Sequence, residues 1–158
     1  MLYPVLLIAL MTVIFCFSAQ SADDSTVESS RICRAVAPAV FSDYAQKTPD
    51  VQEELALGLT FVVRKAAHFT EYALLGGLWY LWLRRRRLGW CLSLAAAALY
   101  AVTDEVHQLF VPGRAGMVQD VLLDSTGAAC GVASVVMLLC VIHGIRCRSA
   151  QERGVWKL

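Results

Sequence analysis

The chain has 158 residues, of which 58% are hydrophobic and 17% are charged, and its formal net charge is +1. A soluble domain of this length would carry more charge, and a general nucleic-acid surface would need a strong basic excess. With a mean hydropathy of +0.56, the composition predicts an integral membrane protein and argues against nucleic acid as a partner.

The N-terminal third contains one apolar stretch and one acidic segment. Residues 2–17 are apolar, and no Lys or Arg precedes them, so we expect a retained helix rather than a cleaved signal peptide. Residues 21–59 have an acidic excess and predict an extracytoplasmic loop of about 40 residues. Within this loop, Asp50 and Glu53 have the spacing of a capping box, which predicts a helix running through Leu55 and Leu59.

Three further apolar stretches cover residues 63–83, 88–110 and 118–145, with a Pro- and Gly-containing turn at 111–116. Each approaches or exceeds the ~20 residues that cross a bilayer core. Gly127 and Gly131 form a small-xxx-small face, which predicts close approach of another helix. The sequence therefore predicts a single all-α membrane domain, residues 1–158, built as a bundle of about four transmembrane helices.

Basic residues predict the orientation. Four arginines occupy residues 84–87, between the second and third spans, and further Lys and Arg follow the fourth span in a tail of residues 146–158. Basic loops stay cytoplasmic, so both termini should be cytoplasmic and the turn at 111–116 extracytoplasmic. We expect a multi-pass protein of a bacterial plasma membrane.

Charged side chains also occur inside the apolar stretches, where each costs at least ~2.5–3.5 kcal/mol on insertion scales. Such groups are retained where they pair or line a polar cavity. At ~1.5 Å per helical residue, Glu71 lies about 20 Å from Arg84 and Asp104 about 25 Å from Arg87. Helical spacing also places the polar residues of each span on one face. One polar pocket opening to the extracytoplasmic side is the expected arrangement.

Three segments carry a resemblance to a known family. They are FSAQ at residues 17–20, RKAAHFTEYALLG at 64–76, and TDEVHQLFVPGRAGMVQDVLLDSTGAACG at 103–131. These segments closely resemble VanZ-like membrane proteins over residues 17–131. The resemblance implies a role in the bacterial cell envelope, including low-level teicoplanin or lipoglycopeptide resistance, but implies no particular reaction. It puts the family's polar signature on Arg64, Lys65, His68, Glu71, Tyr72, Asp104, Glu105, Gln108, Arg114, Asp120 and Asp124.

The principal hypothesis is an enzyme that acts on a lipid-linked phosphate or carboxylate. Arginine suits such oxyanions through paired donors. Catalysis would fall to acid–base groups, for which burial favours the neutral form; the candidates are His68, Glu71, Asp104 and Glu105. The candidates for substrate binding are Arg64, Lys65, Tyr72, His107, Gln108, Arg114, Asp120 and Asp124.

Three alternatives stay open. The pocket could belong to a non-catalytic binder or transporter of envelope lipids, or the polar groups could form a packing network. No cofactor is assigned, because Arg64, Lys65 and Arg114 can neutralise the buried acids. The alternative is a divalent metal held by the pairs His68-x-x-Glu71 and Asp104-x-x-His107.

Overall fold

The computed structural model describes the backbone of residues 2–152 and the side chains of residues 2–146. Within that range it is entirely helical and has no strand, which confirms the all-α prediction. Arg153 and Lys157, two of the basic residues in the predicted tail, lie outside the described residues. The elements are α1 (Leu2–Ser18), α2 (Ala22–Val40), the short 3-10 helix η1 (Tyr44–Gln46), α3 (Pro49–Leu83), α4 (Gly89–Gln108) and α5 (Val118–Glu152).

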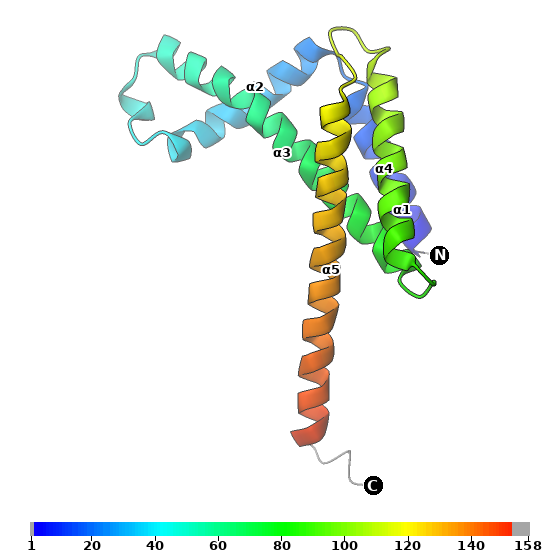
Figure 1. Cartoon of the computed structure of the whole chain (residues 1–158). Coiled ribbons are helices and arrows are strands. Elements are labelled where there is room, and N and C mark those ends of the chain that lie inside the picture. Colours follow the sequence, from blue (N-terminus) through cyan, green and yellow to red (C-terminus); the bar gives the residue numbers. More distant parts are fainter. Residues whose placement is uncertain (1, 153–158) are drawn as a thin grey trace.

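Helix α3 is the centre of the fold and contacts each of the other four α-helices. Figure 1 shows α1, the second half of α3, α4 and the first half of α5 packed as a bundle. Helix α2 and the first half of α3 form an arm that projects from this bundle, because the chain bends by 105° between α1 and α2. The second half of α5 extends beyond the other helices.

The segment expected to be a 40-residue loop is largely helical. Ser21 begins α2 as its N-cap, with its Oγ accepting a hydrogen bond of 3.1 Å from the Asp24 amide. The acidic Asp23 and Asp24 then lie in the first turn, where the helix dipole favours negative charge. The acidic cluster that suggested a loop is therefore a helix start.

The predicted capping box is wrong. Helix α3 begins at Pro49, with Thr48 as the N-cap, so Asp50 already lies in the first turn. Glu53 instead pairs with Arg34 of α2, accepting from Nη2 at 2.7 Å and from Nε at 2.8 Å. A proline at the first helical position has a suitable φ and no amide to satisfy, so it moves the helix start upstream of Asp50.

The predicted spans match the helices in position, but most of these helices are not long and apolar enough by themselves to cross a membrane. Among the described residues, only α5, over Val118–Arg146, is by itself long and apolar enough to cross a membrane. The bent pair α1 and α2 would count as one broken span. Helix α1 has just 17 residues, and α3 and α4 carry the charged motifs. The four-span bundle is thus not confirmed by length and apolarity.

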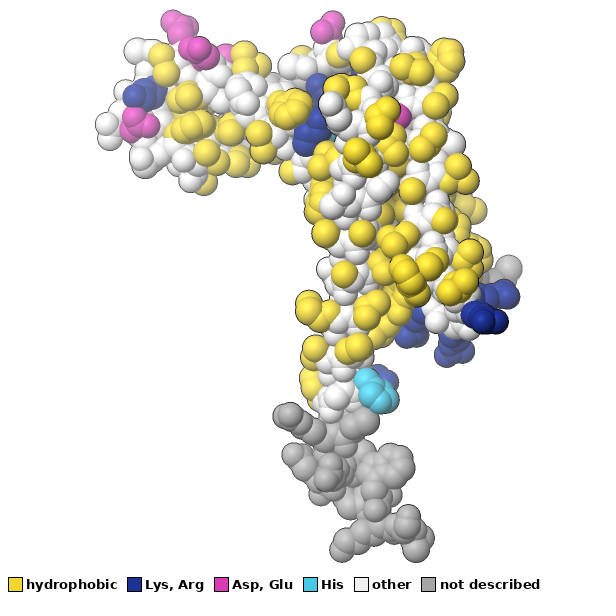
Figure 2. Space-filling view, in the orientation of Figure 1, with side chains coloured by type: hydrophobic (Ala, Val, Ile, Leu, Met, Phe, Trp, Pro, Cys, Tyr) yellow, Lys and Arg dark blue, Asp and Glu magenta, His cyan; other side chains and the backbone are white. Residues whose placement is uncertain are grey.

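Burial on α4 is reversed relative to a water-soluble protein. Its buried face is small or polar and consists of Gly89, Ser93, Ala97, Ala101, Asp104, Glu105 and Gln108. Its exposed face carries large apolar side chains, namely Trp90, Leu92, Leu99, Val102 and Val106. Helix α2 repeats this arrangement in part, burying Ser25, Ser29, Ser30, Cys33 and Ala37 while exposing Val27, Ile32, Val36 and Val40. Its exposed side is mixed, because it also carries the charged residues Asp23, Asp24, Glu28, Arg31 and Arg34. Hydrophobic side chains accordingly cover much of the surface in Figure 2.

Glycines allow α3 and α5 to pack backbone to backbone. A Cβ on Gly127 would lie 2.5 Å from the Phe69 carbonyl oxygen, and a Cβ on Gly131 would lie 2.6 Å from the Ala73 carbonyl carbon. Neither position has room for a side chain, which confirms the predicted small-xxx-small face. This packing fixes the polar residues of α3 against those of α5.

Candidate functional site: a polar cavity at the junction of bundle and arm

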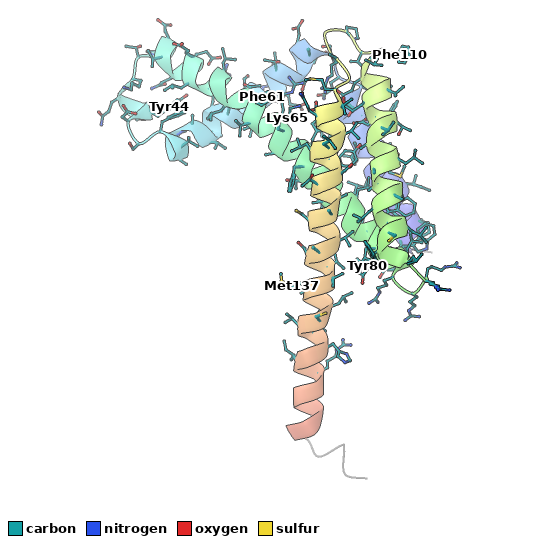
Figure 3. All side chains as sticks on the ribbon, viewed as in Figure 1. Tyr44, Phe61, Lys65, Tyr80, Phe110 and Met137 are labelled. Carbon is teal, nitrogen blue, oxygen red and sulfur yellow. The ribbon has the colours of Figure 1, made fainter. Side chains whose placement is uncertain are left out.

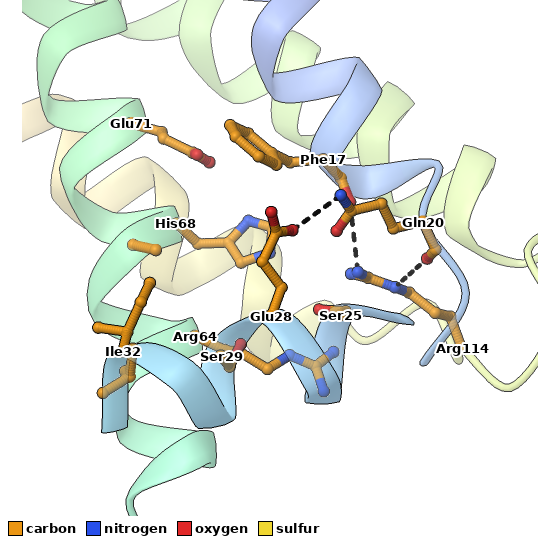
Figure 4. Close-up of a pocket in the computed structure, with 12 residues that line it drawn as sticks. Phe17, Gln20, Ser25, Glu28, Ser29, Ile32, Arg64, His68, Glu71 and Arg114 are labelled. Atoms are coloured by element: carbon orange, nitrogen blue, oxygen red, sulfur yellow. Dashed lines mark hydrogen bonds between the residues drawn. The ribbon is translucent and has the colours of Figure 1, made fainter. Parts of the chain in front are cut away.

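A cavity of about 240 Å³ lies where the end of α1, helix α2 and helix α3 meet. Arg64, His68 and Glu71 reach it from α3, because the i, i+4, i+7 spacing places them on one face. Arg114 reaches it from the turn between α4 and α5 (Figure 4). The remaining lining residues are Phe17, Gln20, Ser25, Glu28, Ser29, Ile32, Val63 and Ala67.

A second cavity of about 230 Å³ lies beside the first. Arg64, His68 and Arg114 line both cavities, so these three side chains separate them. The second cavity adds other predicted site residues to the lining, namely Lys65, Gln108 and Asp120. The structure therefore brings residues of α3, α4, α5 and the turn to one place, as the spacing predicted.

Arg114 connects the turn to the end of α1. Its Nε donates to the Gln20 carbonyl oxygen at 3.0 Å, and its Nη2 donates to the Phe17 carbonyl oxygen at 3.3 Å (Figure 4). Burial lowers the pKa of Arg114, but a guanidinium stays charged because its ordinary pKa exceeds 12. Arg114 thus covers the cavity with a permanent positive charge and has no carboxylate as a direct partner among the described residues.

Lys65 and Asp120 form an ion pair between α3 and α5. The Lys65 ammonium also lies 5.4 Å from the centre of the Phe61 ring; both residues are labelled in Figure 3. The pair is half-buried, and it neutralises Asp120 locally. Lys65 is therefore already engaged, unlike Arg64, whose side chain makes no hydrogen bond or ion pair within residues 2–146.

Glu105 fastens the turn to α4. Its Oε2 accepts the Met117 amide at 2.8 Å, just before α5 begins, and its Oε1 accepts from Gln108 Nε2 at 3.1 Å. A Cβ on Gly116 would lie 2.5 Å from the Glu105 carbonyl oxygen, so the turn needs glycine there. Both carboxylate oxygens of this predicted catalytic residue are thus engaged in local structure.

Asp104 and Asp124 are buried next to His68. Asp124 is completely buried, and neither of its carboxylate oxygens has a hydrogen-bond partner among the described residues. Asp104 Oδ2 accepts from Ser18 Oγ at 2.9 Å, while its Oδ1 has no partner in the same part of the chain. One ligand atom from each of His68, Asp104 and Asp124 lies within 4.8 Å of the other two.

This arrangement corrects the expected neutralisation of the acids. Lys65 pairs with Asp120, Arg114 binds backbone carbonyls, and Arg64 binds no carboxylate among the described residues. None of the three forms an ion pair with Asp104 or Asp124. Cations spaced closely along a sequence need not reach the acids of another helix, because contact depends on how the helices are rotated against each other.

A comparison with known protein families identifies the family of the chain. The sequence profile described as VanZ/LLP1 matches residues 3–141. The chain belongs to the VanZ/LLP1 family. The resemblance seen in residues 17–131 is therefore confirmed, and the match extends over nearly all of α1 and further along α5. Searches among curated proteins and among solved structures found no match.

Five predicted residues of the VanZ/LLP1 chain line neither cavity: Tyr72, Asp104, Glu105, His107 and Asp124. The contacts of the three acids are given above, which leaves His107 and Tyr72. His107 packs on the Phe15 ring of α1, with centroids 4.4 Å apart, and lines neither cavity. Tyr72 is fully buried one helical turn from His68, near Tyr100, and its hydroxyl has no partner among the described residues. The structure therefore groups His68 with Asp104 and Asp124 from two other helices, in place of the predicted pairs His68–Glu71 and Asp104–His107.

The VanZ/LLP1 site includes side chains that were not assigned from the sequence. Ser18 orients Asp104, and Gln20 donates to Glu28 at 2.9 Å on the cavity wall (Figure 4). The motif FSAQ at residues 17–20 was the available signal for Ser18 and Gln20. The α2 residues carried no signal, because their part in the wall depends on the 105° bend.

Proposed function

We propose that this VanZ/LLP1 protein is a multi-pass protein of the bacterial plasma membrane that binds the anionic headgroup of a lipid-linked envelope molecule. The observation that carries the proposal is the first cavity, where Arg64 has no partner among the described residues and Arg114 lies close by. Arginine pairs recognise phosphate and carboxylate oxygens through several charge-assisted hydrogen bonds. The same activity would underlie cell-envelope homeostasis and low-level teicoplanin resistance.

The reversed burial of α4 supports a lipid environment around the bundle. In water, exposed Leu, Val and Trp side chains opposite a buried face of Gly, Ser and Ala would be unfavourable, whereas in a bilayer the apolar face contacts acyl chains. Crossing by α1, the second half of α3, α4 and α5 would bury the apolar face of α4, while α2 in the arm would lie along the membrane surface. The glycine contacts between α3 and α5 are of the kind that drives helix association in membranes.

The charge distribution supports an orientation. The four arginines of residues 84–87 lie at the end of α3 and α4 opposite the turn that carries Arg114 (Figure 1). Basic residues favour the cytoplasmic side, so the cavities would face outward. Positions 86 and 115 are both exposed and provide a test.

This orientation can be checked with a variant lacking the native cysteines. We expect Ala115→Cys to react with a membrane-impermeant thiol reagent on intact cells, and Arg86→Cys to react only after permeabilisation. The reverse labelling pattern would refute the orientation.

The cavity wall suits an amphiphile. Polar groups occupy one side, while Phe17, Ile32 and Val63 provide apolar surface, and Ile32 is 52% exposed on the outer face of α2. A lipid-linked ligand could therefore place its headgroup near Arg64 and its chain along α2. Free phosphate would use only the polar part of the site.

The proposal is tested by binding of a short-chain polyprenyl phosphate to the purified full chain in detergent. Loss of charge-assisted hydrogen bonds costs about 1.5–3 kcal/mol, so Arg64→Ala should weaken binding roughly 10- to 100-fold. Arg85→Ala, an exposed arginine at the opposite end, is the matched control and should bind like the wild type.

Two ligand controls separate the sources of affinity. The uncharged polyprenol should bind at least 10-fold more weakly than its phosphate, and inorganic phosphate should bind more weakly than the lipid. Equal binding of alcohol and phosphate, or equal binding by Arg64→Ala and Arg85→Ala, would overturn the proposed headgroup site.

A further inference from the structure

The group formed by His68, Asp104 and Asp124 has buried polar atoms that lack the partners their chemistry requires. Asp124 is 0% exposed and Asp104 is 3% exposed. Both oxygens of Asp124 and the Oδ1 of Asp104 have no hydrogen-bond partner among the described residues. A buried, unpaired carboxylate is strongly unfavourable, and in native proteins such groups are paired or coordinate a metal.

His68 and its neighbour Tyr72 also have polar atoms without partners. His68 Nδ1 is buried without a hydrogen-bond partner, and so is the Tyr72 hydroxyl one turn further along α3. The i, i+4 spacing places both side chains on the same face of the helix. Unpartnered atoms thus gather from three helices, α3, α4 and α5, at one buried point.

We propose that His68, Asp104 and Asp124 bind a divalent metal ion. Imidazole and carboxylate ligands together suit Zn²⁺ and other first-row divalent ions. Their ligand atoms lie within 4.8 Å of one another. Tetrahedral coordination at about 2.1 Å needs ligand atoms roughly 3.4 Å apart, so side-chain movements on the order of 1 Å close the site.

Surrounding contacts orient one ligand for this role. Ser18 Oγ donates to Asp104 Oδ2 at 2.9 Å and leaves Oδ1 for the ion. Such hydrogen bonds to a ligand's second oxygen are common around metals and hold the carboxylate in place. None of the nearby cations Arg64, Lys65 and Arg114 forms an ion pair with Asp104 or Asp124.

The site would adjoin the proposed headgroup cavity, because His68 lines both cavities. Three protein ligands leave a coordination position open, as in catalytic metal sites. Metal binding itself does not depend on the proposed lipid ligand. It can therefore be measured with no phosphate present.

The test uses Co²⁺ with the full chain, purified in detergent and treated with chelator. Cobalt reports its ligands by absorption, so binding at exposed cysteines would show as thiolate charge-transfer bands. We expect one equivalent to bind with ligand-field bands alone, and Zn²⁺ to displace it. Asp124→Asn should weaken binding at least 100-fold, and Asp104→Asn serves as a second variant if the first does not fold.

Glu71→Gln is the matched control, because it removes a carboxylate from the adjoining cavity but not from the proposed ligand set. It should bind one Co²⁺ with the affinity of the wild type, and Arg64→Ala should do the same. Absence of saturable Co²⁺ binding in the wild type would overturn the proposal. Protonation of Asp104 or Asp124 would then account for their burial without a partner. Unchanged affinity in both Asp104→Asn and Asp124→Asn would also overturn it.

Discussion

Replacing Gly131 by alanine should destabilise the contact between α3 and α5. A Cβ at this position would lie 2.6 Å from the Ala73 carbonyl carbon and 2.9 Å from its Cα. Ordinary carbon–carbon contact begins at about 3.5 Å, so the helices would have to separate by roughly 1 Å. A gap of that size removes a quarter to a half of the dispersion energy of each contact.

The expected magnitude follows from two opposing effects. Overpacking of a tight contact costs about 1–3 kcal/mol, occasionally more. Alanine is a better helix former than glycine by roughly 1 kcal/mol, which offsets part of this cost. We expect a net loss of up to about 2 kcal/mol and, at roughly 2–4 °C per kcal/mol, a thermal midpoint lower by up to about 8 °C.

Gly58→Ala is the matched control, because a Cβ there meets nothing within 4 Å. The midpoint of this variant should equal or exceed that of the wild type. Tryptophan fluorescence during heating in detergent gives the thermal midpoint of the wild type and of both variants. If Gly131→Ala were as stable as Gly58→Ala, the close packing of α3 on α5 would be refuted.

Three further predictions concern the arm, the buried acids and activity. Glu53→Gln should lower the midpoint slightly at neutral pH and low salt. Arg34 lowers the pKa of Glu53 in the folded protein. The ion pair therefore stabilises the fold at pH values above the unfolded pKa of Glu53, ~4.3, and this stabilisation is lost as pH falls through the folded pKa. A difference in midpoint between the variant and the wild type that persists below the folded pKa would contradict this assignment. Ser18→Ala removes the donor to Asp104 and should cost about 1–3 kcal/mol in thermal unfolding, whereas an unchanged midpoint would mean that this hydrogen bond is immaterial. Wild-type protein should raise the teicoplanin tolerance of a sensitive Gram-positive host, and Glu71→Gln at matched membrane level should not. If Glu71 transfers protons, the Glu71→Gln variant should still bind polyprenyl phosphate.

Helical periodicity explains why much of the site could be predicted. Arg64, His68 and Glu71 share a face of α3 whatever the rest of the fold, since a helix repeats every 3.6 residues. The turn between α4 and α5 was equally visible, because Pro112 and Gly113 interrupt the helix. Gly127 and Gly131 likewise indicated a close helix contact without naming the partner.

The arm and the partners of each charge could not be predicted in this way. Helix α2 looked like a loop because its acidic start is polar, although Ser21 caps it and its small residues pack on α3. Whether Lys65 pairs with Asp120 or with Asp124 depends on how α5 is rotated against α3. The backbone contacts of Gly127 and Gly131 with α3 fix that rotation.

The sequence by itself determined the helices of the bundle, the faces on which their polar residues lie, and membership of the VanZ/LLP1 family. Those properties are local or depend on residue identity and spacing. Only the tertiary structure decided that Ser18 holds Asp104, that Arg64 is left without a partner among the described residues, and that His68 meets two buried acids. These contacts join residues far apart in sequence, so they depend on how whole helices pack, and a periodic pattern within one helix carries no record of that packing.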